Sequence, residues 1–402
     1  MLKNIALIHN KYHEYLRENS FQLQQPTIHY FKIITPLVII WLLMQIFFYK
    51  LFGIVTNFEA TKYINEAYFF LETGKFTSTN FIFYSTQILL IALCIKLKID
   101  FLVLVLFQII MNAISIFCFY KLVFKISNNT IISFFSTLYF LLFFYYHLFN
   151  TYLFTESLFF SFSIIYTYFL FTRKEMSVKT LVLILLFLTL LYLTRPTGIF
   201  FLPATYLFLV KKFYPKKAIK ILIFSGIFAF AGLYLLLNFS LGSGGEFDFL
   251  LPYLDERIIC GVPTILHAHH IIIPVEKNSI QGLFYIITHH FDLFFTLSMK
   301  RLSAFFGIHR SYYSVFHNIF ASVYFYLIYL VIIAGIKSLF KKNKAELLFL
   351  VTIIAFTAAT VMLSCDEWSN RFIFAILPFL LLLAVISISN SKKTINARKQ
   401  NA

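Results

Sequence analysis

Apolar residues dominate this chain in long runs that are separated by short polar stretches. A helix needs about 17 to 25 mostly apolar residues to cross the hydrocarbon layer of a membrane. Runs near this length predict about ten spanning helices, at 33–52, 99–120, 131–149, 154–172, 180–194, 197–211, 218–240, 316–338, 347–363 and 372–389. The pattern therefore predicts an all-α polytopic membrane protein.

A further apolar stretch at 81–97 decides the sidedness of everything after it. If this stretch lies at the membrane surface and the N-terminus is cytoplasmic, most Lys and Arg residues fall in cytoplasmic segments that hold few Asp or Glu residues. If it spans, the basic loops at 211–220 and 341–344 face outward, against the positive-inside rule. We therefore predict a juxtamembrane helix at 81–97 and cytoplasmic N- and C-termini.

This layout predicts one transmembrane domain at 33–390, with two large external loops at 53–98 and 241–315. Residues 1–32 are expected to form an amphipathic segment on the cytoplasmic surface, and 391–402 a basic cytoplasmic tail. Residues 1–32 contain no cleavable apolar core, so the first span is expected to stay as an anchor.

Composition supports this interpretation and limits the function. The chain of 402 residues is 60% hydrophobic and only 13% charged, which favours lipid as solvent over a soluble core. Its net charge of +17 lies in short loops between apolar runs, which indicates topology and not nucleic-acid binding. The four cysteines show no metal-like spacing and two lie inside apolar runs, so no disulfide framework is expected.

Ionisable residues at the external ends of the spans are the best candidates for function, because charge near lipid is costly. All of them can converge on one external cavity. They are Glu59, Glu156, Arg195, Asp248, Asp255, Glu256, Arg257, Asp366, Glu367 and Arg371.

Sugar transfer from a lipid phosphate needs few groups of these kinds. A carboxylate must take the proton from the attacking hydroxyl group. Cations must stabilise the phosphate as it leaves and gains charge. A carboxylate opposed by arginines at the membrane surface would meet both needs.

The first external loop carries the first of four motifs. Glu59 is followed by Tyr63, then by Ala67 and by Gly74. This pattern resembles the first-loop motif of GT-C glycosyltransferases of the dolichyl-phosphate-mannose mannosyltransferase and lipid A aminoarabinose transferase kind. That family usually has Asp at the first position, and Glu59 keeps the carboxylate with a longer reach.

The other motifs follow in the family's order. Phe154-Thr-Glu156-Ser-Leu-Phe159 is similar to its Thr-Glu segment, Thr194-Arg195-Pro196-Thr-Gly198 to its Arg-Pro turn, and Arg371 with Pro378 to its last span. Two of these elements are also similar to GPI mannosyltransferase II, although its Ala-Phe-Phe-Pro element is absent.

The resemblance implies a GT-C fold and an inverting hexosyltransferase that acts on a polyprenyl-phosphate-linked sugar at the non-cytoplasmic face. Its partners would be that donor, membrane lipids, and a lipid, glycan or protein acceptor. Glu59 takes the role of catalytic base. The donor phosphate is assigned to Arg195, Arg371 and Arg257, and the site lining to Tyr63, Glu66, Glu156, Asp255 and His269.

Several alternatives stay open at this stage. Glu66 or Glu72 could be the working acid, Glu156 could pair with Arg195 to hold helices together, and Arg195 could anchor a lipid headgroup. The histidines at 267, 269, 270, 289 and 290 leave a divalent cation open, although no Cys or carboxylate completes a known ligand spacing.

Two other functions share the same layout. A transporter or flippase of lipid-linked saccharides should place charges near the bilayer midplane and often shows repeated halves, and this sequence shows neither. A polymerase or ligase of surface glycans could share the large external loop. The bacterial inner membrane is the expected location.

Overall fold

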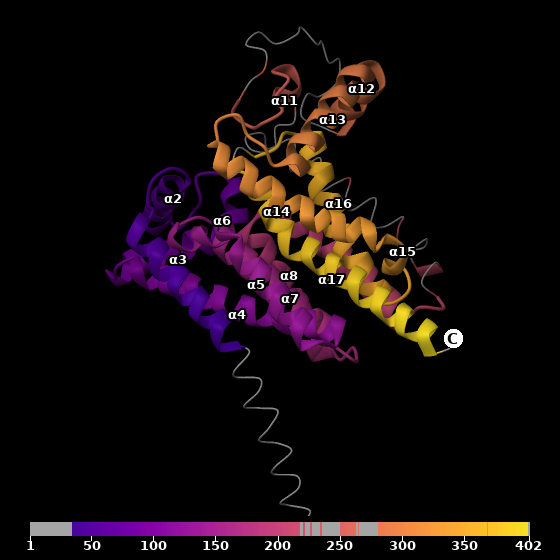
Figure 1. The fold of residues 1–402 in the computed structure, drawn as a ribbon. Coiled ribbons are helices and arrows are strands. Elements are labelled where there is room, and N and C mark those ends of the chain that lie inside the picture. Colours follow the sequence, from indigo (N-terminus) through magenta and orange to yellow (C-terminus); the bar gives the residue numbers. More distant parts are fainter. Residues whose placement is uncertain are drawn as a thin grey trace, which may run out of the picture.

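In the part of the chain that the computed structural model describes, the regular secondary structure is helical (Figure 1). That part is 34–217, 220–221, 226, 234, 250–262, 264, 280–367 and 369–400, with side chains up to 389. The first helix is Ile34–Phe52. It is followed by α2 (Glu59–Thr73), η1 (Thr79–Tyr84), α3 (Ser85–Leu97), α4 (Leu102–Ser127), α5 (Thr130–Leu142), α6 (Phe144–His147), η2 (Leu148–Thr151), α7 (Glu156–Thr172), α8 (Val178–Thr194), η3 (Pro196–Phe200), α9 (Phe201–Phe213), α11 (Leu250–Leu254), α12 (Ile280–His289), α13 (Phe291–Gly307), α14 (Val315–Ala334), α15 (Ile336–Leu339), α16 (Lys344–Leu363) and α17 (Arg371–Gln400).

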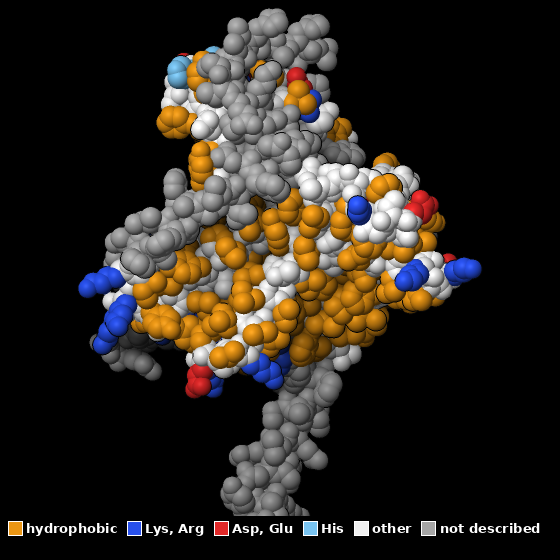
Figure 2. Space-filling view, turned by 180° about the vertical axis from the view of Figure 1, so that it is seen from behind, with side chains coloured by type: hydrophobic (Ala, Val, Ile, Leu, Met, Phe, Trp, Pro, Cys, Tyr) orange, Lys and Arg blue, Asp and Glu red, His pale blue; other side chains and the backbone are white. Residues whose placement is uncertain are grey.

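The structure has the helices of an integral membrane protein. Within the described residues, six helices are long and apolar enough to cross a membrane, or seven if the bent pair Thr130–Leu142 and Phe144–Thr151 is one span. Two shorter apolar helices, Glu156–Thr172 and Val178–Thr194, lie beside them in the bundle. On the face seen in Figure 2, apolar side chains cover the middle of the bundle and Lys and Arg side chains gather at its edges.

The predicted number of about ten spans is therefore met only in part. The predicted run 218–240 lies almost entirely outside the described residues. The run at 197–211 forms the short helices η3 and α9 instead of one long helix. The run at 131–149 bends by 70° after Leu142.

The stretch at 81–97 forms η1 and α3, and together they are also long and apolar enough to span. At the start of α3, the Tyr84 ring packs on the Tyr63 ring of α2, with 5.5 Å between their centroids. The side chain of Gln87, the third residue of α3, hydrogen-bonds to Gln108, the seventh residue of α4. The start of α3 thus lies beside α2 and beside the near, N-terminal end of α4.

Helix α17 forms the centre of the bundle, and Arg371–Ser389 is the most buried of the apolar helices described. It packs closely on the turn between α14 and α15. The closeness is evident at Gly335 in this turn, where an added Cβ atom would overlap the side chain of Ser387 on α17. Helices α14 and α5 are joined by Tyr139 and Tyr324, whose rings stack and whose hydroxyl groups each donate to the other's carbonyl. Close helix contact of this kind replaces the hydrophobic driving force that lipid cannot supply.

Helices α11, α12 and α13 lie together at one end of the bundle, on the side where α2 also lies (Figure 1). Arg301 of α13 holds this region to the bundle. Its guanidinium donates to the carbonyl groups of Pro252, Arg257 and Met362 at 2.9 to 3.0 Å, and it lies over the Tyr253 ring. The side chain is buried and uses polar partners throughout, as buried charge requires.

A disulfide bond joins Cys260 to Cys365, so the expectation of no disulfide was wrong. The two cysteines are 105 residues apart in sequence, and spacing alone gave no sign that they meet. Backbone hydrogen bonds between the same segments, from Cys260 to Asp366 and from Asp366 to Ile258, bring the two sulfur atoms together. Cys94 and Cys118 are free and buried.

Reduction of this disulfide is expected to destabilise the protein strongly. In the chain-entropy account, closing a loop of about 100 residues contributes about 4 to 5 kcal/mol. Thermal unfolding of the purified protein in detergent, followed with and without a phosphine reductant, should show a lower Tm after reduction. The matched variant Cys118→Ala should keep that dependence, and Cys260→Ala should lose it. Equal unfolding curves for oxidised and reduced wild type would contradict the assignment.

Candidate functional site

Four residues predicted from distant parts of the sequence meet at one place. They are Glu59, Glu156, Arg195 and Arg371, and Glu367 joins them. We call these five residues the carboxylate–arginine cluster. Glu59, Glu156 and Arg371 are the first residues of α2, α7 and α17, and Arg195 follows the last residue of α8. The cluster therefore lies where the ends of four helices converge.

Glu156 lies at the centre of the cluster. Its side chain is fully buried, and its Oε1 atom accepts hydrogen bonds from Arg195 Nη1 at 2.5 Å and from Arg371 Nη1 at 2.7 Å. A buried carboxylate is costly unless it is paired in this way. The predicted pairing of Glu156 with Arg195 is thus present, and Arg371 adds a second cation.

Arg371 binds three carboxylates at once. Its Nη1 atom pairs with Glu59 and Glu156, and its Nη2 atom donates to Glu367 at 2.5 Å. A positive charge at a helix N-terminus is opposed by the helix dipole, so helix stability does not explain an arginine here. Its Nε atom is buried and has no hydrogen-bond partner among the described residues. One donor of the guanidinium is therefore unused.

Glu59 is the carboxylate of the cluster that is most accessible to solvent. Its side chain is 19% exposed, against 10% for Glu367 and 0% for Glu156. Tyr63, one turn further along α2, donates its hydroxyl proton to Glu59 at 2.6 Å, and Lys62 lies 3.2 Å away. An acceptor molecule arriving from solvent could therefore contact Glu59 but not Glu156.

The charge environment sets the proton affinity of Glu59. Burial alone would raise its pKa, but the charge of Arg371, followed by those of Lys62 and Arg195, outweighs burial and holds the pKa well below its usual value. Burial and the adjacent Glu59 charge raise the pKa of Tyr63 far above its usual value, so its hydroxyl stays a donor. Glu59 is ionised at neutral pH and weakly basic in this arrangement.

Backbone pairing brings Glu59 and Glu156 together. The amide of Val55 donates to the carbonyl of Thr151, and the amide of Leu153 donates to the carbonyl of Val55. These bonds join the segment before α2 to the segment before α7. Phe58, directly before Glu59, has a φ of 55°, an unfavourable conformation for a large L-residue that often occurs at functional sites.

The segment before α17 is fixed from two sides. The disulfide of Cys365 holds it to the 258–262 loop, and Asp366 forms a buried ion pair with Arg310. The Asn370 side chain donates to the carbonyl of Ile308 at 2.9 Å. Asn370 has a φ of 61°, which asparagine tolerates better than most residues. Arg371 therefore emerges from a rigidly held turn.

Arg195 is placed by the tight turn that follows α8. Its carbonyl accepts from the amide of Gly198, and Pro196 begins η3. A Cβ atom at position 198 would overlap the carbonyl group of Leu191, so only glycine fits where the turn meets α8.

Gly198→Ala is accordingly expected to destabilise the protein by about 1–3 kcal/mol, the usual range for forced overpacking, and to displace Arg195. The matched control is Gly307→Ala, where the nearest atom to an added Cβ is the Tyr326 hydroxyl at an ordinary 3.9 Å. Thermal unfolding of both variants is the measurement. A Gly198→Ala protein as stable as the control would show that the turn is not tightly packed.

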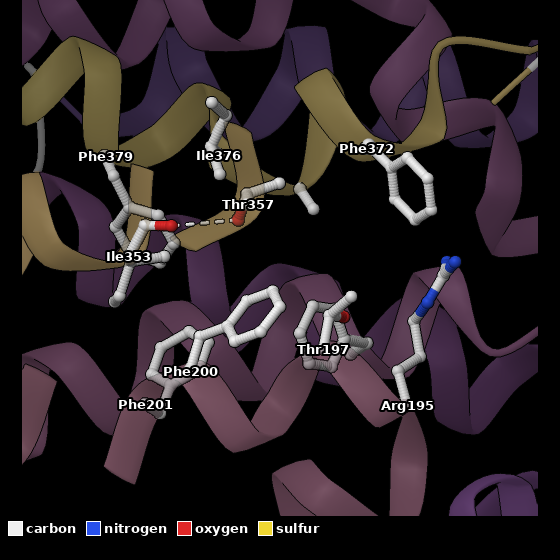
Figure 3. A pocket seen from close by; sticks show the side chains of 11 residues that line it. Arg195, Thr197, Phe200, Phe201, Ile353, Thr357, Phe372, Ile376 and Phe379 are labelled. Carbon is white, nitrogen blue, oxygen red and sulfur yellow. Dashed lines mark hydrogen bonds between the residues drawn. The ribbon is translucent and has the colours of Figure 1, made fainter. Parts of the chain in front are cut away.

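An apolar cavity opens next to Arg195 between η3–α9, α16 and α17 (Figure 3). In Figure 3 the Arg195 side chain stands at one end of the cavity and points toward α17. The remaining lining is almost wholly apolar and comprises Phe159, Thr197, Phe200, Phe201, Ile353, Thr357, Phe372, Ala375, Ile376 and Phe379. A cation thus stands at the end of a hydrocarbon-like cavity.

Other predicted site residues lie elsewhere. Glu66 is buried, and its two oxygens accept hydrogen bonds from the backbone amide and the hydroxyl group of Thr77, both at 2.7 Å. It joins α2 to the segment that follows. Asp255 and Arg257 pair with each other within the loop after α11. No ion pair between described residues connects Arg257 to the cluster, and His269 lies outside the described residues.

Two members of the site were not singled out from sequence. Lys62 was not considered, although its i,i+3 spacing from Glu59 on a helix would have placed it beside that carboxylate. Glu367 was only one of many external charges, although it stands four residues before Arg371. Among the described residues, no group of three or more His, Cys, Asp or Glu is placed to hold a metal ion.

The chain was compared with models of protein families, with curated proteins and with solved structures. No family model, no curated protein and no solved structure matches it.

Proposed function

We propose that this protein is a membrane glycosyltransferase of the GT-C type that transfers a sugar from a polyprenyl-phosphate-linked donor to an acceptor. One observation carries the proposal: a solvent-accessible carboxylate, Glu59, pairs with Arg371 beside the buried Glu156–Arg195 pair, and Arg195 stands at the end of an apolar cavity. A transporter of lipid-linked saccharides needs no such base. The carboxylate and the arginines together match the needs of transfer.

Glu59 and the two arginines have separate roles in the chemical step. Glu59 takes the proton of the acceptor hydroxyl group, and the acceptor oxygen forms a bond to C1 of the sugar from the face opposite the phosphate. The bond from C1 to the phosphate oxygen breaks, and its electron pair stays on that oxygen. The phosphate diester, a monoanion, thereby becomes a monoester dianion. Arg195 and Arg371 stabilise the charge that develops on the phosphate.

The apolar side chains around the cavity would contact the isoprenoid chain of the donor only after they move apart, because the cavity as it stands has room for no more than about one water molecule. With the chain against Phe200, Ile376 and Phe379, the phosphate would lie at the end where Arg195 stands. The unused Nε donor of Arg371 provides a hydrogen bond for a phosphate oxygen. Arginine suits this role because its planar fork of donors matches phosphate geometry.

The site would face the non-cytoplasmic side of the membrane. Disulfides persist in oxidising compartments, and the bond between Cys260 and Cys365 holds the segment that leads into Arg371. This placement requires 81–97 to lie along the membrane surface, because α2, the start of α3 and the near end of α4 lie together. With this topology the basic loops and both termini are cytoplasmic.

A donor panel tests the proposal. Purified protein in lipid nanodiscs is incubated with a series of polyprenyl-phosphate sugars and with an extract of candidate acceptors, and products are followed by mass spectrometry. The expected result is a glycosylated product that depends on one donor of the panel. Products from diphosphate-linked oligosaccharides alone would instead indicate a polymerase or ligase.

A further inference from the structure

Arg371 holds the proposed base in a weakly basic state. Its Nη1 atom pairs with both Glu59 and Glu156. Glu59 also contacts Lys62 and Tyr63 on its own helix. General bases work best with a pKa near the working pH. A carboxylate clamped by an arginine departs from that optimum, so the observed arrangement is a resting state.

The three carboxylates on Arg371 differ in how easily an incoming anion can displace them. Glu156 is fully buried and Glu367 is 10% exposed, so removing their cation would leave poorly solvated charge. Glu59 is 19% exposed and would keep Lys62 and Tyr63 as partners after losing Arg371. Glu59 is therefore the carboxylate that an arriving phosphate should displace.

We propose that Arg371 is a latch on Glu59, and that the donor's phosphate releases the base by taking the guanidinium from it. This inference rests on the proposed function and adds an order to it, since the acceptor is activated only after the donor is bound. Arg371 has the two properties that a latch needs. It holds the most exposed carboxylate of the cluster, and it keeps one buried donor, Nε, without a partner among the described residues.

The pKa of Glu59 shows whether Arg371 is bound to this carboxylate. The groups that face Glu59 are Lys62 and Tyr63 on α2, Arg371 on α17, Arg195 after α8, and Glu156 on α7 through their shared guanidinium. Among these groups, the charge of Arg371 lowers the pKa of Glu59 most, ahead of the charges of Lys62 and Arg195. Loss of one adjacent opposite charge raises a carboxyl pKa by about one to three pH units.

Carbodiimide labelling of the full chain in nanodiscs measures this change at a single residue. The reagent modifies protonated carboxyl groups, and peptide mass spectrometry gives the labelling midpoint of Glu59 against pH. Glu72, exposed on the same helix, serves as the internal standard. The probes are undecaprenyl phosphate and, as the control lipid without phosphate, undecaprenol.

The midpoint of Glu59 is expected to lie well below that of Glu72 without lipid, and to rise by about one to three pH units with undecaprenyl phosphate. Undecaprenol should leave it unchanged. In Arg371→Met the midpoint should be raised before any lipid is added. A midpoint that undecaprenyl phosphate raises equally in Arg371→Met and wild type would overturn the latch, because the effect would not pass through Arg371.

Retention of radiolabelled undecaprenyl phosphate by the same nanodiscs separates this inference from the proposed function. Saturable binding that Arg195→Met weakens, together with an unchanged Glu59 midpoint, would overturn the latch and leave the phosphate site standing. Absence of saturable binding would overturn both.

Discussion

Replacing Glu59 by Gln is expected to abolish sugar transfer, with a loss of about 100- to 10,000-fold in kcat, the usual contribution of a general base. The amide keeps the size and the hydrogen bond from Tyr63 but cannot take the acceptor's proton. Transfer is measured with the active donor of the panel, at saturating donor concentration.

Two controls accompany this experiment. Thermal unfolding of Glu59→Gln should stay near that of wild type, because the side chain is partly exposed and Glu156 keeps both arginines. The matched control is Glu72→Gln, an exposed carboxylate on the same helix, which should retain full activity. A fully active Glu59→Gln protein would remove this residue from the mechanism and leave another carboxylate to be found.

Arg371→Met should cause the second large effect, a loss of about 100- to 1,000-fold in kcat, as for removal of one preorganised donor to a developing anion. It should also lower the stability, because truncating a partner in a buried ion pair typically costs about 3–5 kcal/mol. Arg195 still pairs with Glu156 in this variant, which places the expected stability loss at the low end of that range.

Arg371→Lys separates the two effects. A lysine restores the charge but not the fork of donors that reaches several oxygens at once. Stability, measured by thermal unfolding, should recover more than activity does. Activity that returns fully with lysine would mean that charge alone is needed and that the geometry of the guanidinium has no part in the reaction.

The core of the site was predictable because membrane topology restricts where charge can lie. Glu59, Glu156, Arg195 and Arg371 all stand where an apolar run meets a polar segment, and the structure brings them into one cluster. In lipid, ionisable side chains collect at helix ends and in protein-lined sites. Four such residues at one end of a bundle are therefore expected to lie close together.

The expectation of no disulfide was wrong because disulfide pairing depends on loop structure, which hydropathy does not encode. Cys260 and Cys365 meet because two irregular segments exchange backbone hydrogen bonds, and no periodicity predicts that pairing. The Arg257 guanidinium pairs with Asp255, two residues away, a contact that hydropathy does not indicate either, and its assignment to the phosphate stays a prediction. Such local pairs form wherever a turn allows them.

Two of the predicted spans are interrupted for a related reason. A hydropathy run measures apolar length and does not detect a break inside it. The run at 131–149 bends at Phe143, where neither Pro nor Gly marks the interruption, and the run at 197–211 begins with the short 3-10 helix η3. Both breaks lie beside the segments that carry Glu156 and Arg195, so the irregular backbone serves the site.

The most direct test of the central claim is the fate of the donor phosphate, followed by ³¹P NMR in nanodiscs that contain the purified protein and the active donor with its acceptor. Breaking the bond from C1 to the phosphate converts a phosphodiester signal into a phosphomonoester signal. We expect this conversion with wild type and not with Glu59→Gln. A diester signal that persists for every donor, while the lipid-linked sugar crosses the bilayer of proteoliposomes, would contradict the account.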